Sequence, residues 1–344
     1  MREVAEFRVD ERFASMLFTD REGKRLGDSV RKVQIETSDP RFKQVGRLQR
    51  ELRVKQDEPF FYGWDLKHEY SQQELQQASL FFLKSAAIFE PPGEMCGTEY
   101  DESTACPRCG AGAEQRSDLR LDLRKAPRNK DIACTIAGEW IVSQRLAERM
   151  IDEGLTGLEL RRVRHHARYE DDPLDFHQVA SGRKLLRKAE IAGAPHPGAR
   201  FWVWLNRAEN RALLDEAYAE YATSRREKAR RKGKPAPVWH QLIVTSAHAE
   251  IVPPTRVGNN PFDDDPKGEG RCPLGHLIGL NRLSEVSISA TTRGDVDVVS
   301  SRQFVGVRRG VLRPERLILI SPKARSIIES EGLKGTTIEV AYLV

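Results

Sequence analysis

The sequence lacks a long hydrophobic run. Its most apolar stretch, residues 80–89, is short and contains Lys84, whereas a helix that spans a membrane needs about 20 apolar residues. Charged residues begin at Arg2, where a secretory signal would place an apolar stretch, so we expect no export by that route. These absences predict a cytoplasmic protein without a membrane anchor.

Cysteine is scarce, with five residues in a chain of 344. That number is too small for a disulfide framework, and an odd count in a chain without a signal indicates reduced thiols or a metal site. Catalytic motifs are missing as well: the sequence has no phosphate-binding glycine loop, no GxSxG elbow and no HExxH. We therefore predict a non-enzymatic protein with no catalytic residues. An enzyme with an unrecognised site is the weakest alternative.

Positive charge is confined to one short run. Residues 225–234 hold seven basic residues and one acidic residue, a net charge of +6, while the whole chain carries +5 and the rest therefore sums to −1. A general nucleic-acid binder usually has a basic face across a domain, so this distribution weakens that interpretation. The run ends a helix predicted over residues 209–232. It is either a solvated helix end or a docking patch for an acidic partner.

Local patterns predict several further elements. Alternation of apolar and polar residues indicates strands at 31–37 and 118–124, and buried strands are expected at 201–205 and 238–244. The sequence Ser-Gln-Gln-Glu at 71–74 fits a capping box. Apolar residues follow it at helical spacing, which predicts a helix through Leu75, Ala78, Phe82 and Ala86.

The chain contains an internal repeat. Residues 141–157 align without gaps with residues 319–335, at an offset of 178, and Ser143 falls opposite Ser321. In both copies an apolar strand ends at this serine, which can cap the following helix. Both copies then reach Gly-Leu-x-Gly, where a glycine can end the helix in a left-handed conformation, and a second strand follows. Each copy is therefore predicted to be a strand–helix–strand unit.

Two knuckle-like sequences precede the repeats. The first is Cys106-Pro-Arg-Cys109-Gly and the second is Cys272-Pro-Leu-Gly-His276. Three thiols and one imidazole are a standard ligand set for Zn²⁺, which takes four such ligands in a tetrahedron. We predict a structural zinc site at Cys106, Cys109, Cys272 and His276. Four protein ligands would leave no position open for catalysis.

Other interpretations of these residues stay open. Cys96 is a rival zinc ligand, the cysteines can be present without any ion, and Cys106 with Cys109 can be a redox dithiol. A second metal centre is a weaker hypothesis than a solvated loop for the segment with His165, His166, His177, Glu170, Asp171, Asp172 and Asp175.

These patterns together predict an α+β fold of two related halves. Each half is a cysteine knuckle plus a strand–helix–strand unit, and a split zinc ribbon joins the halves. The expected segments are an N-terminal α+β extension at 1–92, the first knuckle and unit at 93–164, an insertion with a strand and the basic helix at 165–237, and the second knuckle and unit at 238–344.

This order of parts resembles the double-CXXCG motif proteins. The resemblance rests on Cys106-x-x-Cys109-Gly, a strand–helix–Gly-x-x-Gly unit, a second cysteine knuckle and a second such unit, over about residues 93–164 and 238–344. Members of that family are known mainly from myxobacteria and are often described as immunity proteins of toxin exchange systems. This chain is longer, and its second knuckle reads CPLGH. The resemblance implies a non-enzymatic cytoplasmic protein that binds and neutralises a cognate toxin.

The favoured function is thus binding of a protein partner, most specifically a toxin. The basic run at 225–234 and the acidic loop at 262–265 are candidate contacts. The second hypothesis is a nucleic-acid-binding zinc-ribbon protein, whose binding would collapse as salt rises. The sequence predicts no membrane partner and leaves the oligomeric state and the identity of the partner open.

Overall fold

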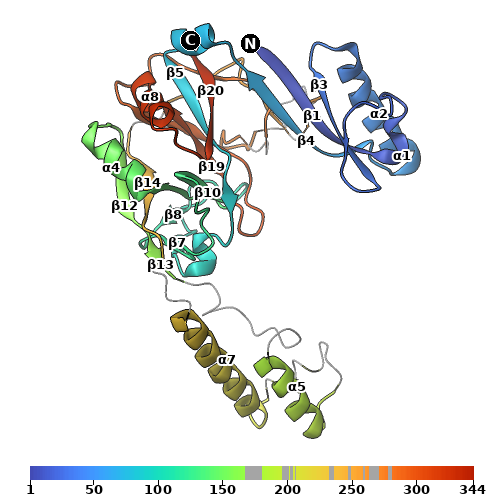
Figure 1. Ribbon diagram of the computed structural model, residues 1–344, viewed down its shortest axis with the longest axis vertical. Coiled ribbons are helices and arrows are strands. Elements are labelled where there is room, and N and C mark those ends of the chain that lie inside the picture. The colour runs from blue at the N-terminus through green and yellow to red at the C-terminus, as the bar shows by residue number, and fades with distance from the viewer. Residues whose placement is uncertain are drawn as a thin grey trace.

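The computed structural model of the chain describes residues 1–166, 180–195, 201, 204–205, 207–231, 236–246, 249–258, 260–262, 271–277 and 281–344. Helices and strands are mixed along it, which confirms the predicted α+β class. Three sheets of four or five strands form the body of the molecule. Helices α5 (Ala180–Ile191) and α7 (Arg211–Arg231) lie apart from that body (Figure 1).

The N-terminal sheet has the strand order β2-β3-β1-β4 and is antiparallel throughout. Helix α2 (Pro40–Gln56) begins at the capping residue Asp39 and packs apolar side chains against this sheet. The strand predicted at 31–37 is confirmed as β3. The elements of this unit are β1 (Arg2–Asp10), α1 (Glu11–Ala14), β2 (Lys24–Arg25), β3 (Val30–Glu36) and β4 (Phe61–Glu69).

Phe262 completes the N-terminal core from far along the chain. Its ring centroid lies 4.8 Å from that of Phe42 and 6.0 Å from that of Phe7. Gly46 on α2 makes this approach possible, because a Cβ at that position would come within 2.7 Å of the Phe262 ring. The N-terminal sheet is therefore fixed to the segment that leads towards Cys272.

Two five-stranded sheets form the rest of the body, with the orders β12-β14-β11-β10-β6 and β17-β20-β5-β19-β18. The first contains β6 (Ile88–Phe89), β10 (Ile132–Thr135), β11 (Trp140–Ser143), β12 (Leu158–Arg162) and β14 (Trp239–Val244). The second contains β5 (Leu80–Ser85), β17 (Val286–Ile288), β18 (Val298–Val305), β19 (Glu315–Ile320) and β20 (Thr336–Leu343). We call them the first and second large sheets.

Both repeat segments are strand–helix–strand units, as predicted. Helix α4 (Gln144–Asp152) joins β11 to β12, and helix α8 (Pro322–Ser330) joins β19 to β20. The side chains of Ser143 and Ser321 cap these helices by accepting from the third backbone N–H of each helix. The local signals in the repeat therefore fix the same structure twice.

The two large sheets exchange strands with each other. In each unit the two strands are separated by a strand from another part of the chain: β14 lies between β11 and β12, and β5 lies between β19 and β20. Strand β5 precedes the first unit along the chain but belongs to the sheet of the second. Strand β14 precedes the second unit but belongs to the sheet of the first. Each large sheet therefore contains a strand that is not part of its own strand–helix–strand unit.

Reciprocal contacts of two aspartates join the units. Asp131 accepts from the capping serine of α4 at 3.0 Å and from the backbone N–H of Lys334, in the other unit, at 3.2 Å. Asp297 accepts from the capping serine of α8 at 2.8 Å and from the backbone N–H of Thr156 at 3.1 Å. One apolar cluster also contains buried residues of both helices, including Leu146 on α4 and Ile327 on α8. The two units therefore share a core.

Two of the predicted elements are wrong. The helix after the capping box is only α3 (Gln72–Gln77), and Leu80–Ser85 is strand β5. Phe81 and Phe82 of this strand pack into different apolar clusters on its two faces, so both are buried and the helical spacing is accidental. The described part of 201–205 is helical, contrary to the predicted strand.

The strand predicted at 118–124 is reduced to β9 (Arg120–Leu121), although Leu119, Leu121 and Leu123 are all buried as the alternation indicates. The strand expected at 238–244 is confirmed as β14. The remaining short elements are β7 (Tyr100–Asp101), β8 (Glu114–Gln115), β13 (Arg164–His165), β15 (Val257–Gly258), β16 (Asn281–Arg282) and a 3-10 turn at Gly93–Cys96.

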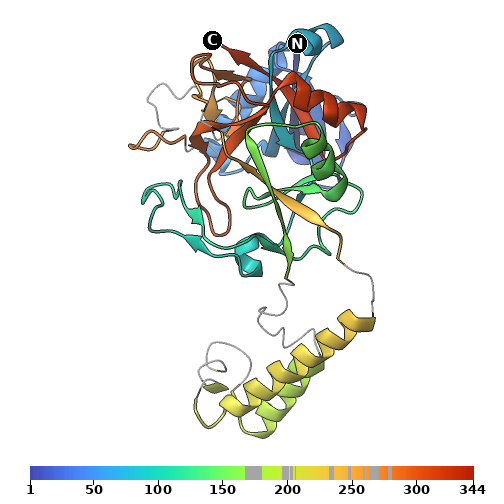
Figure 2. The same cartoon turned by 90° about the vertical axis from the view of Figure 1, so that its left-hand side faces the viewer.

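Helices α5 and α7 pack on each other through a small apolar cluster that includes Leu185 and Leu214. The ion pairs Lys184–Glu220 and Lys188–Glu216 span the same pair of helices. Figure 2 shows them as a separate arm below the sheets. The helix predicted at 209–232 is thus confirmed as α7. Within the described chain, no helix has the length and apolar character that crossing a bilayer requires.

His68 joins the N-terminal sheet to the second large sheet. Its ring, only 1% exposed, lies 3.0 Å from a carboxylate oxygen of Glu3 on β1 and 3.2 Å from one of Glu339 on β20. Burial favours the neutral ring, but the hydrogen bonds and charges of the two carboxylates outweigh it and raise the pKa of His68 to about 9.

The first prediction concerns the close approach of the repeat glycines. A Cβ at Gly157 would lie 2.1 Å from the carbonyl oxygen of Val298, whereas one at Gly154 would meet nothing within 4 Å. Both glycines have positive φ, so Gly154→Ala should cost about 1–2 kcal/mol of unfolding free energy. Gly157→Ala should cost more than about 4 kcal/mol in urea denaturation, because backbone must also move. Equal losses would contradict the contact between the units.

The second prediction is a pH dependence of stability. The folded-state pKa of His68, about 9, exceeds the unfolded value of about 6.5. The charged ring therefore stabilises the fold fully below about pH 6.5 and loses this effect as the pH rises through about 9. The difference in unfolding free energy between the wild type and His68→Gln should accordingly shrink between about pH 6 and pH 9.5. A difference that stays constant would contradict the proposed ion pairing.

Candidate metal centre

The first knuckle is a tight turn that directs two thiols to one side. The backbone N–H of Gly110 donates to the carbonyl oxygen of Cys106 at 2.8 Å, and the N–H of Cys106 donates to the carbonyl oxygen of Ala111 at 2.7 Å. Gly110 has a φ of 76°, which a glycine adopts without strain. The Cys-x-x-Cys-Gly spacing is therefore matched to the turn that it forms.

The second knuckle makes a similar turn. The N–H of Cys272 donates to the carbonyl oxygen of His276 at 2.7 Å, and the N–H of Gly275 donates to that of Cys272 at 2.8 Å. Gly275 has a φ of 84°. The backbone N–H of Leu274 donates to the Cys272 sulfur at 3.3 Å. In a Cys-x-x-Cys knuckle the second cysteine would occupy position 275, so His276 lies one position after it.

The connection between β18 and β19 holds the two knuckles together. The N–H of Arg308 donates to the carbonyl oxygen of Cys109 at 2.8 Å. On the other side, the N–H of Leu277 donates to the carbonyl oxygen of Phe304 at 3.0 Å, and the N–H of Gly306 donates to that of Leu277 at 2.8 Å. Sequence reasoning misses this connection, because no metal ligand lies in it.

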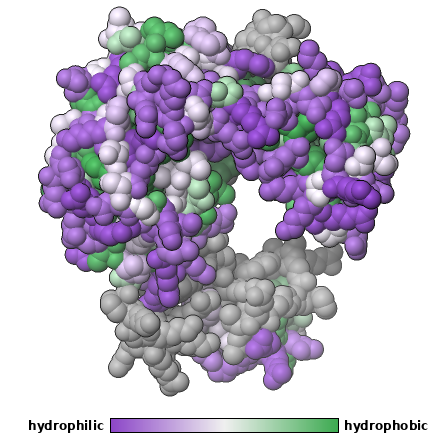
Figure 3. Space-filling model, turned by 45° about the horizontal axis from the view of Figure 1, so that its top comes forward, coloured by the Kyte–Doolittle hydropathy of each residue, from purple (hydrophilic) through white to green (hydrophobic). Residues whose placement is uncertain are grey.

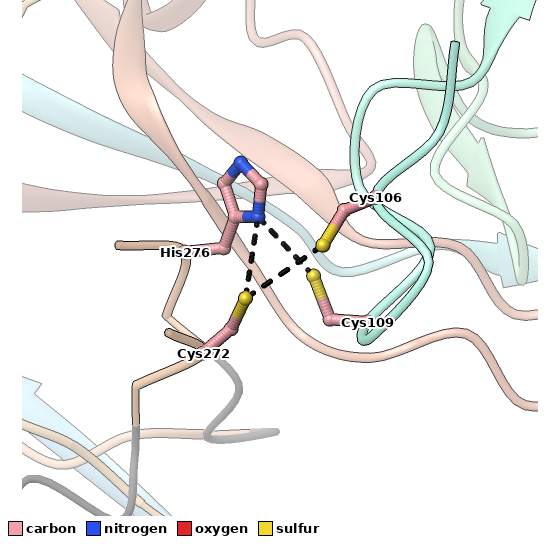
Figure 4. Close-up of side chains that lie close together, drawn as sticks. All are labelled: Cys106, Cys109, Cys272 and His276. Carbon is pink, nitrogen blue, oxygen red and sulfur yellow. Dashed lines mark hydrogen bonds between the residues drawn. The ribbon is translucent and has the colours of Figure 1, made fainter. Parts of the chain in front are cut away.

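Four ligand atoms from the two knuckles converge in space (Figure 4). The three sulfurs and one histidine nitrogen all lie within 4.8 Å of one another. The sulfurs of Cys106 and Cys272 are 3.7 Å apart, and Nδ1 of His276 lies 3.3 Å from the Cys109 sulfur and 3.8 Å from that of Cys272. In a tetrahedron with ordinary zinc bond lengths, neighbouring ligand atoms are about 3.5–3.8 Å apart. The cluster can therefore bind one metal ion.

The surroundings affect the thiols unequally. Burial opposes ionisation of Cys106, but the backbone N–H groups of Arg108 and Cys109 outweigh it and lower the pKa of Cys106 to about 6. Burial raises the pKa of Cys109 to about 11, and the neighbouring Cys106 adds to this effect. A cation among the thiols would favour the thiolate form of each, because it compensates negative charges that lie close together.

Two arginines reinforce the joint between the knuckle and the β18–β19 connection. Arg313 pairs with Glu94 at 2.8 Å and with Glu102 at 2.6 Å, and its guanidinium lies 3.9 Å from the centre of the Tyr100 ring. Arg308 pairs with the same two carboxylates. The Arg313 side chain is only 8% exposed, so its pairs are screened less than ordinary surface ion pairs.

The other cysteines lie outside the cluster. Cys96 and Cys134 are both buried, and neither belongs to the group of ligand atoms found within the described residues. Cys134 is in strand β10, and burial raises the pKa of its thiol well above the usual value. The four residues predicted as metal ligands are thus brought together, and the rival ligand Cys96 is not among them.

Several predicted contacts lie largely outside the described residues. His165 and His166 are described: Nδ1 of His165 is 3.2 Å from the N–H of Leu123, and Nδ1 of His166 is 2.6 Å from the carbonyl oxygen of Cys96. The rest of the hypothetical second metal centre is not, namely His177, Glu170, Asp171, Asp172 and Asp175. The side chains of the basic run at 225–234 and residues 263–265 of the acidic loop are also outside the described part.

Comparison with known proteins gives no independent assignment. No protein-family model matches the chain, and no curated protein matches it. The functional interpretation therefore depends on the site itself and on the resemblance noted from the sequence motifs.

The third prediction concerns the stoichiometry and geometry of the metal site. Titration of the metal-free protein with Co²⁺ should saturate at one ion per chain and give the strong visible absorption of a tetrahedral thiolate complex. Cys109→Ser should weaken Co²⁺ binding by more than about 100-fold, beyond the loss expected for an outer-shell partner. Cys134→Ser, which alters a buried cysteine outside the cluster, is the matched control and should bind like the wild type. A weak octahedral spectrum would contradict the ligand set.

Proposed function

We propose that Cys106, Cys109, Cys272 and His276 bind one Zn²⁺ ion in a structural site. Three sulfurs and one imidazole suit zinc better than the hard cations Mg²⁺ and Ca²⁺, which prefer oxygen. Four protein ligands would fill the tetrahedron, which supports a structural rather than a catalytic role. Zinc at this position would join two knuckles that are 166 residues apart. The site would thereby stabilise the folded chain against separation of its parts.

We also propose that the two strand–helix–strand units and their knuckles are related halves of a duplicated protein. The sequence repeat, the reciprocal contacts of Asp131 and Asp297 and the exchange of β5 and β14 support this interpretation. Exchanged strands are what a swapped dimer would leave behind after fusion of its two chains. In this view the metal centre is the split zinc ribbon that joins the halves.

The function that the site supports best is non-enzymatic binding of a protein partner, with neutralisation of a toxin as its most specific form. The observation that carries this proposal is the Cys₃His cluster, because four protein ligands on one ion would make the body rigid and leave no open position for chemistry. The toxin role comes from the resemblance to the double-CXXCG motif proteins. The arm of α5 and α7 supplies a surface for contact away from the sheets, and its α7 carries the start of the basic run.

Figure 3 is consistent with a polar contact surface. Hydrophilic residues cover most of the visible face of the described chain, and hydrophobic residues form small separate areas on it. An obligate partner would usually bury a larger apolar patch. A partner that binds on this face would therefore depend mainly on charged and polar contacts, and the candidate segments at 225–234 and 262–265 are also rich in charge.

The fourth prediction tests the proposed partner. Affinity capture of the full chain from its native host should recover one protein in stoichiometric amount. Expression of that protein alone should stop growth, and co-expression of this chain should restore it. A variant in which the six arginine and lysine residues at 225–232 are replaced by glutamine should bind the partner at least about tenfold more weakly if charge pairing contributes the usual energy.

Capture with Cys109→Ser separates the two parts of the proposal. If this variant loses both its metal and its partner, the zinc site supports the binding surface. Recovery of nucleic acid alone, with affinity that falls steeply as salt rises, would overturn the protein-binding function and favour the zinc-ribbon alternative. It would leave the metal site itself intact.

A further inference from the structure

A cavity of about 490 Å³ lies where the N-terminal sheet meets the two large sheets. Its walls include Trp64 on β4, Trp140 on β11 and the β19 residue Glu315, and Ile88 on β6 is part of the same lining. Ile88 is 68% exposed, which is unusual for a large apolar side chain inside a folded body. A cavity of this size, whose walls combine apolar and aromatic side chains with charged groups, can hold a small molecule.

The basic groups on the wall already have partners. Arg282 pairs with Glu339, and Lys84 pairs with Asp65 at 3.4 Å. Arg313 is held by its two glutamates, as described above. The Arg316 guanidinium donates to two backbone carbonyl oxygens on β18 and lies 4.1 Å from the centre of the Phe304 ring. These cations are therefore oriented by the protein itself.

Glu315 is the acidic group on the wall that the structure leaves without a partner. Within the described chain its carboxylate makes no hydrogen bond or ion pair, in contrast to that of Asp65. Its side chain is exposed to solvent and also lines the cavity, and desolvation by the surrounding protein raises its pKa to about 7. Gly138 leaves room for its carboxylate, because a Cβ there would come within 2.9 Å of Oε2. A carboxylate in this position gains most from a ligand that brings a positive charge.

We propose that this cavity binds a small organic cation with an apolar body, whose amidinium, guanidinium or ammonium group pairs with Glu315. Aromatic walls also favour such ligands, because indole rings attract cations. The proposal is independent of the zinc site and of the protein partner. The same charged group is carried by arginine and lysine side chains, so a side chain presented by another protein is a second source of this chemistry.

A carboxylate is the rival ligand. The Nε–H groups of Arg282 and Arg313 are buried without a hydrogen-bond acceptor in the described structure, and both residues line the cavity. Both guanidinium groups already pair with carboxylates, Arg282 with Glu339 and Arg313 with Glu94 and Glu102. An anion would therefore gain less charge pairing there than a cation gains at Glu315, and we favour the cation.

The fifth prediction is made for three probes of the same shape. Benzamidine is cationic, benzamide is neutral and benzoate is anionic, and each is titrated into the full chain by calorimetry at pH 7.5. Benzamidine should bind saturably and at least about tenfold more tightly than the other two, because only its amidinium group can form a charge-assisted hydrogen bond with Glu315. Acetyl-arginine amide, titrated in parallel, distinguishes the sources: binding tighter than that of benzamidine identifies a protein side chain as the occupant, and weaker binding identifies a free small molecule.

Glu315→Gln provides the decisive variant. Glutamine has the same shape as glutamate, and the replaced side chain has no protein partner, so the fold should be unaffected. The thermal unfolding midpoint checks this. The substitution should abolish the preference for benzamidine over benzamide. Glu220→Gln, on the arm, is the matched control and should retain the preference. Equal binding of all three probes, tighter binding of benzoate, or a preference that survives in Glu315→Gln would overturn the proposal.

Discussion

The convergence of two distant knuckles on one point is the constraint on which the rest of the structure depends. Cys106 and Cys109 approach from one side, Cys272 and His276 from the other, and the connection between β18 and β19 holds both in place. Burial and the neighbouring Cys106 raise the pKa of Cys109, so thiolates this close together are costly without a compensating charge. A cation bound there would remove that cost. It would also add a cross-link over 166 residues to the hydrogen bonds that join the knuckles.

The exchanged strands also relate this cross-link to the entropic cost of folding. Because β5 lies in one large sheet and β14 in the other, neither sheet can form before chain segments from both sides have come together. Such non-local pairing costs a large amount of chain entropy for loop closure before any contact compensates for that loss. A metal bound by both knuckles would lower this cost by closing a loop of 166 residues. The aspartates at the starts of β10 and β18 then fix the two units in a single relative position.

Local features of this structure could be predicted from the sequence, and long-range ones could not. The turn at Cys106, the serine caps of α4 and α8 and the Gly-Leu-x-Gly ends follow from the chemistry of neighbouring residues. The clustering of the four residues could be predicted because a tetrahedral metal site requires four donors and the two knuckles supply four. Strand β5 was mistaken for a helix, because an apolar strand buried on both faces has no period-two pattern. The exchange of β5 and β14 and the lone carboxylate of Glu315 have no local signature, since both arise from how distant segments meet.

X-ray absorption at the zinc edge of the purified full-length chain tests the central claim most directly. The account predicts one zinc ion per molecule, with a first shell of about three sulfur atoms near 2.3 Å and one nitrogen near 2.0 Å. A shell of oxygen and nitrogen atoms alone, or a protein that purifies in a folded state with no bound metal, would contradict it.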